Sequence, residues 1–280
     1  ATGGANYEFF VGAASQGAAS ATATFTTTSL TNGQTVTVIV TNASSCSATS
    51  AGITTTVNAV PTAGLTSSDA DNIICAGESV TFTATGGANY EFFVGAASQG
   101  AASATATFTT TSLTNGQTVT VIVTNASGCT VTSSGITITV DSLLPTVSSV
   151  TSTAANGTYK IGDIIPITIT FSETVNITGI PQLTLETGGI DQIVDFTSVS
   201  GATLTFDYTV QAGDVSADLN YKATNSLALN LGTIKDIAGN NATLTLPALA
   251  SANSLGGSKA IVVDGVVPTV TNVSSTFANG

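Results

Sequence analysis

The sequence contains no histidine, arginine, methionine or tryptophan, and only 7% of its residues are charged. Ordinary globular domains carry roughly 25% charged residues. Without histidine, the Ser–His and Cys–His pairs that activate many catalytic nucleophiles are excluded. A carboxylate pair of the glycosidase kind stays formally open, with Glu8 and Glu91 as candidates because both lie beside aromatic residues. A solvent-facing position on an alternating strand explains both equally well, so we expect a protein that is not an enzyme.

Positive charge is scarce and confined to one half of the chain. The formal net charge is −12, and the cations are Lys160, Lys222, Lys235 and Lys259. The first half therefore has nothing with which to neutralise phosphates, which argues against nucleic acid and anionic membranes as partners. No apolar run approaches the roughly 18–20 residues that span a bilayer, so we expect no membrane insertion. A dilute acidic surface instead suits divalent cations.

The residues that fill the sequence are small, β-branched or hydroxylated: Thr, Ser, Ala, Gly and Val. Such residues fit a pleated, half-solvated sheet and suit helices poorly. Apolar and hydroxylated residues alternate, as in Val80, Phe82 and Ala84 and again in Val119 and Val121, which predicts strands with one buried face. The expected fold class is all-β.

The chain contains two internal repeats. Residues 1–46 return as residues 84–129 with one difference, Ser45 against Gly128, and residues 144–157 return more loosely as 267–280. Repetition at a domain-sized period predicts a string of modules. We interpret the chain as a window from a longer repetitive polypeptide.

The repeats predict four segments. The first module (residues 1–59) is an N-terminally incomplete immunoglobulin-like repeat, and the second module (60–142) is the complete version. The third module (143–265) is a larger sandwich of the adhesin type, and residues 266–280 start a further repeat. Short strands separated by Gly-rich turns predict tandem immunoglobulin-like β-sandwiches, joined end to end by short Pro-containing linkers.

Two local signals refine these strands. Asn32-Gly33 and Asn115-Gly116 sit between two strand-like runs and predict tight hairpins. Pro166 interrupts the alternating run 164–171, so that strand is predicted to be an edge strand, or to have a start that lacks one ladder bond.

The three cysteines allow one pair within a complete module. Cys75 precedes one strand-like run and Cys129 follows another, and a disulfide between them would stabilise the module by roughly 4 kcal/mol. Such a bond would imply an oxidising compartment and export. Buried free thiols are the alternative.

Motifs in the second and third modules resemble known repeat families. The third module carries NGTYKIGDIIPITITFSETV (156–175), QAGDVSADLNY (211–221) and KDIAGNNATLTL (235–246), which resemble the tandem immunoglobulin-like repeats of giant bacterial surface adhesins. The stretch ICAGESVTFTATGG (74–87), with the closing ASGC, is similar to repeats in very large surface proteins of Bacteroidetes. The resemblance implies export by the type IX system, and the mobile adhesins of gliding motility are the best-known giants of this kind.

The resemblance also suggests bound ions and glycans. Carboxylates in loops or at strand ends of the third module and its junctions are candidate calcium ligands, because calcium takes six to eight oxygen ligands; they are Asp141, Asp163, Glu173, Asp236 and Asp264. Capping of turns by the same side chains is the alternative. The triplet 141–143 resembles a short bacterial O-glycosylation motif and makes Ser142 a candidate glycan acceptor.

Three functions stay open at this point. In the first, the modules form the stalk of a secreted cell-surface adhesin and space a distal binding region from the cell, for surface attachment or gliding. In the second, each module binds polysaccharide. In the third, modules assemble into a surface filament by strand exchange. The expected partners of the stalk are other repeats of the same chain, anchoring machinery at the cell surface, and polysaccharide or substratum bound by other regions.

Overall fold

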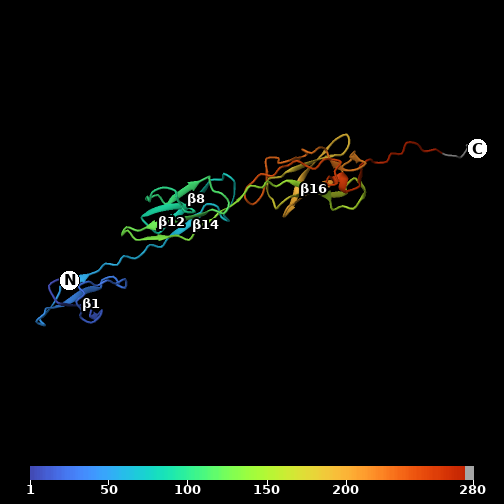
Figure 1. The fold of residues 1–280 in the computed structure, drawn as a ribbon. Helices are drawn as coiled ribbons and strands as arrows, with labels where there is room; N and C mark the ends of the chain where they lie inside the picture. Colours follow the sequence, from blue (N-terminus) through green and yellow to red (C-terminus); the bar gives the residue numbers. More distant parts are fainter. Residues whose placement is uncertain (275–280) are drawn as a thin grey trace, which may run out of the picture. The chain divides into compact units, whose positions relative to one another are not determined.

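The computed structural model describes residues 1–274, and strands make up nearly all of their regular structure (Figure 1). The one helix among these residues, α1 (Leu255–Ser258), is a single turn. The predicted all-β class is confirmed, and the abundance of β-branched side chains is its local cause. Within the described part of the chain, no helix has the length and the apolar character needed to cross a membrane.

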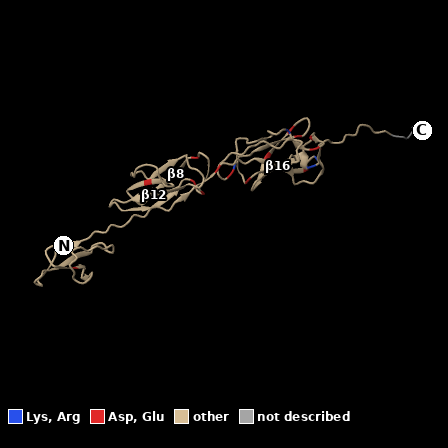
Figure 2. Cartoon of the chain, viewed as in Figure 1, with Lys and Arg blue, Asp and Glu red and all other residues tan. Residues whose placement is uncertain are grey.

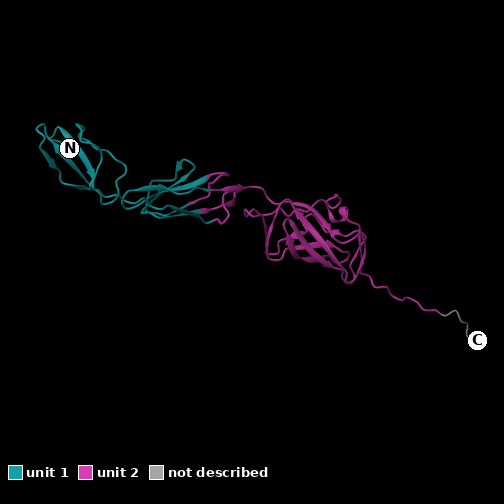
Figure 3. Cartoon of the chain, turned by 90° about the horizontal axis from the view of Figure 1, so that it is seen from below, with its two compact units in different colours: residues 1–68, 81–108, 118–136 teal, residues 69–80, 109–117, 137–280 magenta. Residues whose placement is uncertain are grey.

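The chain divides into two compact units, which Figure 3 draws in teal and magenta. One unit comprises residues 1–68, 81–108 and 118–136, and the other comprises residues 69–80, 109–117 and 137 onward. This division runs through the second module, so the module boundaries after residues 59 and 142 stay predictions. Residues 266–274 form no strand or helix, and the rest of the predicted further repeat (275–280) lies outside the described residues.

The first module forms one antiparallel sheet in the order β2-β1-β3-β4, with β5 also paired to β3. Its strands are β1 (Asn6–Val11), β2 (Ala14–Ser15), β3 (Thr35–Thr41), β4 (Ser47–Thr49) and β5 (Ile53–Thr54). Phe9 pairs in register with Val38. Because directly paired residues share a face, the apolar side chains of β1 and β3 gather on one side of the sheet.

The second module repeats this sheet in the order β10-β9-β12-β13, with β14 paired to β12. Its strands are β9 (Asn89–Val94), β10 (Ala97–Ser98), β12 (Thr118–Thr124), β13 (Thr130–Thr132) and β14 (Ile136–Thr137). A further sheet has the order β11-β8-β6, from β6 (Gly64–Ser67), β8 (Val80–Thr85) and β11 (Thr107–Thr110). The first module has no counterpart of β6 and β8.

The predicted alternation in the second module is confirmed, but the predicted hairpin is wrong. Val119, Val121 and Val123 are 0% exposed, while Thr120 and Ile122 between them are half-buried. The turn itself forms, since Gly116 has a φ of 80° and Gln117 N donates to Thr114 O at 3.1 Å. However, the strand before this turn, β11, pairs with β8, and β12 pairs with β9. The turn therefore connects two sheets.

The third module contains a seven-stranded sheet and two small ones. The large sheet has the order β16-β18-β22-β21-β20-β24, with β25 paired to β20. Its strands are β16 (Val147–Ser152), β18 (Ile164–Phe171), β20 (Gln182–Glu186), β21 (Gln192–Ser200), β22 (Thr203–Thr209), β24 (Asn220–Tyr221) and β25 (Leu227–Ala228). The small sheets join β17 (Gly157–Lys160), β23 (Val215–Ser216) and β27 (Ile261–Asp264), and join β19 (Asn176–Thr178) to β26 (Thr233–Lys235).

Pro166 lies in an interior strand, because β18 has β16 on one side and β22 on the other. The prediction of an edge strand is therefore wrong. The other predicted alternative, a strand whose start lacks one ladder bond, describes the structure. Pro166 O accepts hydrogen bonds from Ser152 Oγ at 2.7 Å and Thr153 N at 3.3 Å, where β16 ends. The missing N–H of proline thus falls at the end of the partner strand, where it removes little from the ladder.

A single apolar core holds the third module together. The inward residues of β18 and β22, among them Ile167, Ile169, Leu204 and Phe206, are 0% exposed. The ring of Phe206 meets Phe196 edge to face at a centroid distance of 6.2 Å. Such burial contributes about 1.5–3 kcal/mol for each large side chain, and it positions the loops that carry the candidate site.

Candidate cation site

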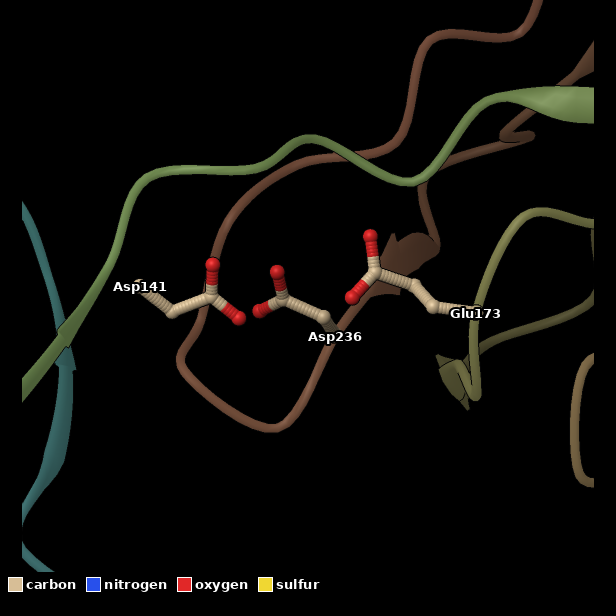
Figure 4. Close-up of side chains that lie close together, drawn as sticks. All are labelled: Asp141, Glu173 and Asp236. Carbon is tan, nitrogen blue, oxygen red and sulfur yellow. The ribbon is translucent and has the colours of Figure 1, made fainter.

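Three of the predicted calcium ligands come together in the structure. Asp141 ends β15 (Thr139–Asp141), Glu173 follows β18, and Asp236 follows β26. One carboxylate oxygen from each lies within 4.8 Å of the others, and Figure 4 shows the carboxylate of Asp236 between the other two. We call this group the acidic triad. Side chains that are 32 and 63 residues apart in sequence meet here because the ends of three strands do.

The loop after β26 fixes the central carboxylate of the triad. Asp236 is 3% exposed, and its two carboxylate oxygens accept from Asn240, one from the backbone N at 2.8 Å and one from Nδ2 at 2.9 Å. The same Nδ2 donates to the backbone oxygen of Asp141 at 3.1 Å. Asn240 therefore ties two members of the triad together, a role that the sequence analysis missed. The motif at 235–246, which contains Asn240, was the available signal.

Within the triad, the carboxylate of Glu173 is destabilised by burial and by its negatively charged neighbours. Burial raises the pKa of its carboxyl group, and the negative charges of Asp236 and Asp141 raise it further. Two carboxylates that share a site resist joint ionisation unless a cation offsets their charge. The lysines of the chain all belong to the third module (Figure 2), and Lys160 and Lys222 pair with Asp163 and Asp191.

The geometry of the triad fits a divalent cation. Calcium binds oxygens at about 2.3–2.6 Å, so two of its ligands lie at most about 5 Å apart. The 4.8 Å limit within the triad meets this condition. Three carboxylates offer up to six oxygens, and each oxygen of Asp236 keeps a lone pair beyond its bond to Asn240. An ion held there would relieve the repulsion on Glu173.

The other two predicted ligands lie elsewhere in the third module. Asp163 closes a turn on Lys160, accepting from its backbone N at 2.9 Å, and this bond lowers the pKa of the Asp163 carboxyl group. Asp264 is paired in register with Lys160 across β17 and β27, and its Oδ1 accepts from Val266 N at 3.1 Å. Both carboxylates thus cap turns, which is the alternative to calcium binding given above. Ser142, the candidate glycan acceptor, is exposed beside Asp141.

The predicted disulfide between Cys75 and Cys129 is not formed, since all three cysteines, within the described residues, are free. The thiol of Cys75 lies 3.5 Å from Glu78 Oε2, and β7 (Ile73–Cys75) pairs with β15 so that Cys75 faces Asp141. The thiol of Cys129 lies 3.8 Å from the backbone oxygen of Asn58. Each thiol therefore has its own surroundings, and burial raises the pKa of Cys75, which keeps it protonated. The sequence argument for an oxidising compartment loses this support.

The aromatic residues beside Glu8 and Glu91 line a hollow that occurs in both copies. Its volume is about 180 Å³ in the second module, where Tyr90, Phe92 and Phe108 line it, and about 160 Å³ in the first. Glu91 alternates with Tyr90 and Phe92 along β9 and so faces the other side of the strand. Its carboxylate accepts from Ser98 Oγ at 2.7 Å. Glu91 therefore does not belong to the hollow.

Comparisons with known proteins give structural likeness only. No protein-family profile and no curated protein matches the sequence. Among solved structures, the fibronectin(III)-like modules of Clostridium thermocellum CbhA share 16% identity, with 65% of this chain and 90% of that chain covered and a TM-score of 0.36. Three N-terminal domains of the bacteriophage RB49 outer capsid protein Hoc share 12%, with 82% and 86% covered and a TM-score of 0.35. A 1.5-MDa bacterial ice-binding adhesin shares 16%, with 74% and 70% covered and a TM-score of 0.32. At these scores the likenesses carry no argument about function, and the chain is described by its own features as a set of repeated all-β modules.

Proposed function

We propose that this chain is part of the stalk of a large secreted cell-surface adhesin, in which repeated β modules hold a distal binding region away from the cell. The observation that carries the proposal is the near-identity of residues 1–46 and 84–129, which differ at one position. A part that works through its length gains from repeating the same unit. A catalytic or recognition site has no such need for a copy.

The two copies also form the same local structure, which supports modular use. Gly12 N donates to Thr35 O at 2.8 Å, and the equivalent Gly95 N donates to Thr118 O at 2.8 Å. Ser15 and Ser98 bond Glu8 and Glu91 at 2.7 Å in each copy. Each repeat thus has its own network of bonds, as expected of a unit that can be added in series.

Binding of polysaccharide by every module receives less support. The aromatic hollow measures about 160–180 Å³ in the two copies. Pockets that enclose small-molecule ligands have volumes of about 300–1,000 Å³. The hollow is therefore small for a sugar chain, and the stalk is the better proposal for these modules.

We further propose that calcium at the acidic triad stiffens the junction ahead of the third module, since Asp141 belongs to the last strand of the second module and Glu173 and Asp236 belong to the third. At the level of biology, the proposal is an adhesin of the Bacteroidetes type that uses type IX export, with a role in attachment or gliding. The full-length polypeptide should then carry a terminal sorting domain and a non-repetitive binding region.

Small-angle scattering of the purified chain tests the stalk. A compact protein of this length has a radius of gyration of about 19 Å. Three modules in series, each about 35 Å long, extend to about 105 Å and give a radius of gyration of about 30 Å. The stalk predicts the larger value. A radius of gyration near about 19 Å would contradict the stalk proposal. A glycan array on the same sample tests the alternative that each module binds polysaccharide.

A further inference from the structure

The sheet of the first module leaves an apolar face only partly covered, whereas the second module buries the equivalent face. In the second module Val119, Val121 and Val123 of β12 are 0% exposed. The identical strand β3 of the first module keeps only its central valine, Val38, buried, at 9% exposed. We call Phe9, Val36, Val38 and Val40 the open face. Because the two strands have the same sequence, the difference in burial comes from what covers them.

Strand β8 and its neighbours cover this face in the second module. The inward residues of β8 are buried, with Val80 and Phe82 at 0% and Ala84 at 2% exposed. The ring of Phe82 stacks on Phe108 at 6.3 Å, and Phe108 stacks on Phe92 of β9 at 5.7 Å. In the first module Phe9 and Phe25 repeat the second of these contacts at 5.5 Å. Residues 1–59 contain no counterpart of β8 to continue the stack.

The end of the missing strand is nevertheless marked in the first module. Ala84, near the end of β8, donates from its backbone N to Ala106 O at 2.8 Å. Ala1 is the counterpart of Ala84, and its amino group donates to Ala23 O at 2.7 Å. Ala1 thus occupies the position that the last part of a β8-type strand takes on this sheet.

Space for the segment before β8 is also present. Gly86 has a φ of 99°, and a side chain there would meet the backbone oxygen of Thr62 at 1.7 Å. The equivalent Gly3 has a φ of 92° but no atom within 4 Å of the same point. The backbone of Gly3 therefore adopts the conformation that accommodates a neighbour like Thr62, while the place of that neighbour is open.

We propose that the open face is the docking surface of one specific occupant, a β6–β8 segment with the sequence of residues 60–83. The structure already contains this pairing of sequences, since residues 84–129 carry the same sheet and residues 60–83 cover it. The paired strands β6 and β8 bear no charge and present Val and Phe to a face of Val and Phe. The inference concerns a surface that the stalk proposal does not use, and either can fail alone.

Hydrogen exchange on an extended chain tests the proposal. The variant carries a second copy of residues 60–83 fused ahead of Ala1, and exchange is followed in peptides that span residues 35–46 and 118–129. Ser45 and Gly128 give these two peptides different masses, so the second module serves as a standard within the same molecule. In the chain without the extension, 35–46 should exchange at least about tenfold faster than 118–129, and the extension should remove the difference.

A matched control carries the same extension with Asp in place of the residues copied from Val80 and Phe82, and it should leave 35–46 as fast as before. The free peptide 60–86, added to the chain without the extension, gives a second measurement if the fusion folds poorly. Unchanged exchange with both fusion and peptide would overturn the proposal. Equal protection of 35–46 and 118–129 before any addition would also overturn it, and a concentration-dependent dimer would then identify a second copy as the cover.

Discussion

At the scale of single residues, Asp214 is a buried carboxylate of the third module that depends on its hydrogen-bond donors. Its side chain is 2% exposed and accepts three hydrogen bonds. The donors are Tyr208 Oη at 2.6 Å, the Gln211 backbone N at 2.8 Å and Gln192 Nε2 at 2.9 Å. A buried carboxylate is tolerated when its oxygens are satisfied in this way, and removing its acceptors leaves donors without partners.

The substitution Asp214→Asn should therefore lower the free energy of unfolding of the third module by about 2–3 kcal/mol. The amide that replaces Oδ2 cannot accept from Tyr208 and Gln211, which both donate to that oxygen. Urea unfolding followed by circular dichroism measures the change. The control is Asp207→Asn, at an exposed position of β22, where a change within about 0.5 kcal/mol is expected.

Two buried tyrosines predict a loss of stability at alkaline pH. Burial raises the pKa of Tyr221 to about 12, and burial together with the bond to Asp214 raises the pKa of Tyr208 further. Unfolded tyrosine ionises near pH 10, so the unfolded state releases protons first. Stability is thus complete below about pH 10 and falls above it, by about 1.4 kcal/mol per pH unit for each tyrosine.

Unfolding in urea at pH 8, 10 and 11 measures this slope. The variant Tyr208→Phe should be less stable at pH 8, because Asp214 loses a donor, yet it should lose less additional stability between pH 10 and 11. Equal slopes for the variant and the unchanged protein would show that Tyr208 does not cause the alkaline loss.

At the scale of elements, the acidic triad joins the ends of three strands, and calcium should strengthen that junction. Extracellular calcium modules bind with dissociation constants of about 10⁻⁴–10⁻³ M. At about 10 mM calcium, binding to the folded state alone adds about 1.4–2.7 kcal/mol to the free energy of unfolding. The melting temperature of the third module should therefore rise by several degrees, and chelator should reverse the rise.

The substitution Glu173→Gln should abolish this response with little effect on stability without calcium. Glu173 suffers repulsion from Asp236 and Asp141, so losing its charge removes a ligand and a strain together. Asp163→Asn is the matched control, because Asp163 lies on the Lys160 turn, and it should leave the calcium response intact. A melting temperature that changes with neither calcium nor chelator would contradict calcium binding at the acidic triad.

At the scale of the whole molecule, repeated modules should unfold separately. Phe206 is 0% exposed in the core of the third module. Phe206→Ala should lower the free energy of unfolding of that module by about 3–5 kcal/mol, which lowers its calorimetric transition on the order of 10 °C. The transition of the second module should stay in place. A single transition that moves as a whole would mean that the modules share one cooperative core.

The sequence by itself determined the all-β class, the repeat and the main buried strands. These features are local, because alternation between apolar residues and threonine assigns a buried face wherever the strand ends up. Val119, Val121 and Val123, and likewise Ile167 and Ile169, are buried as their spacing predicts.

Only the tertiary structure decided which strands pair, which carboxylates meet and what the thiols do. Pairing is a choice among distant partners, so the turn at Asn115-Gly116 formed as predicted while its two strands went to different sheets. Pro166 is tolerated in an interior strand because β16 ends beside it. The acidic triad forms because the ends of three strands lie close together. Asp163 is also a carboxylate at a strand end, but it lies on the Lys160 turn, away from the triad. Periodicity along a chain carries no information about such coincidences, because they depend on distances through space between residues far apart in sequence.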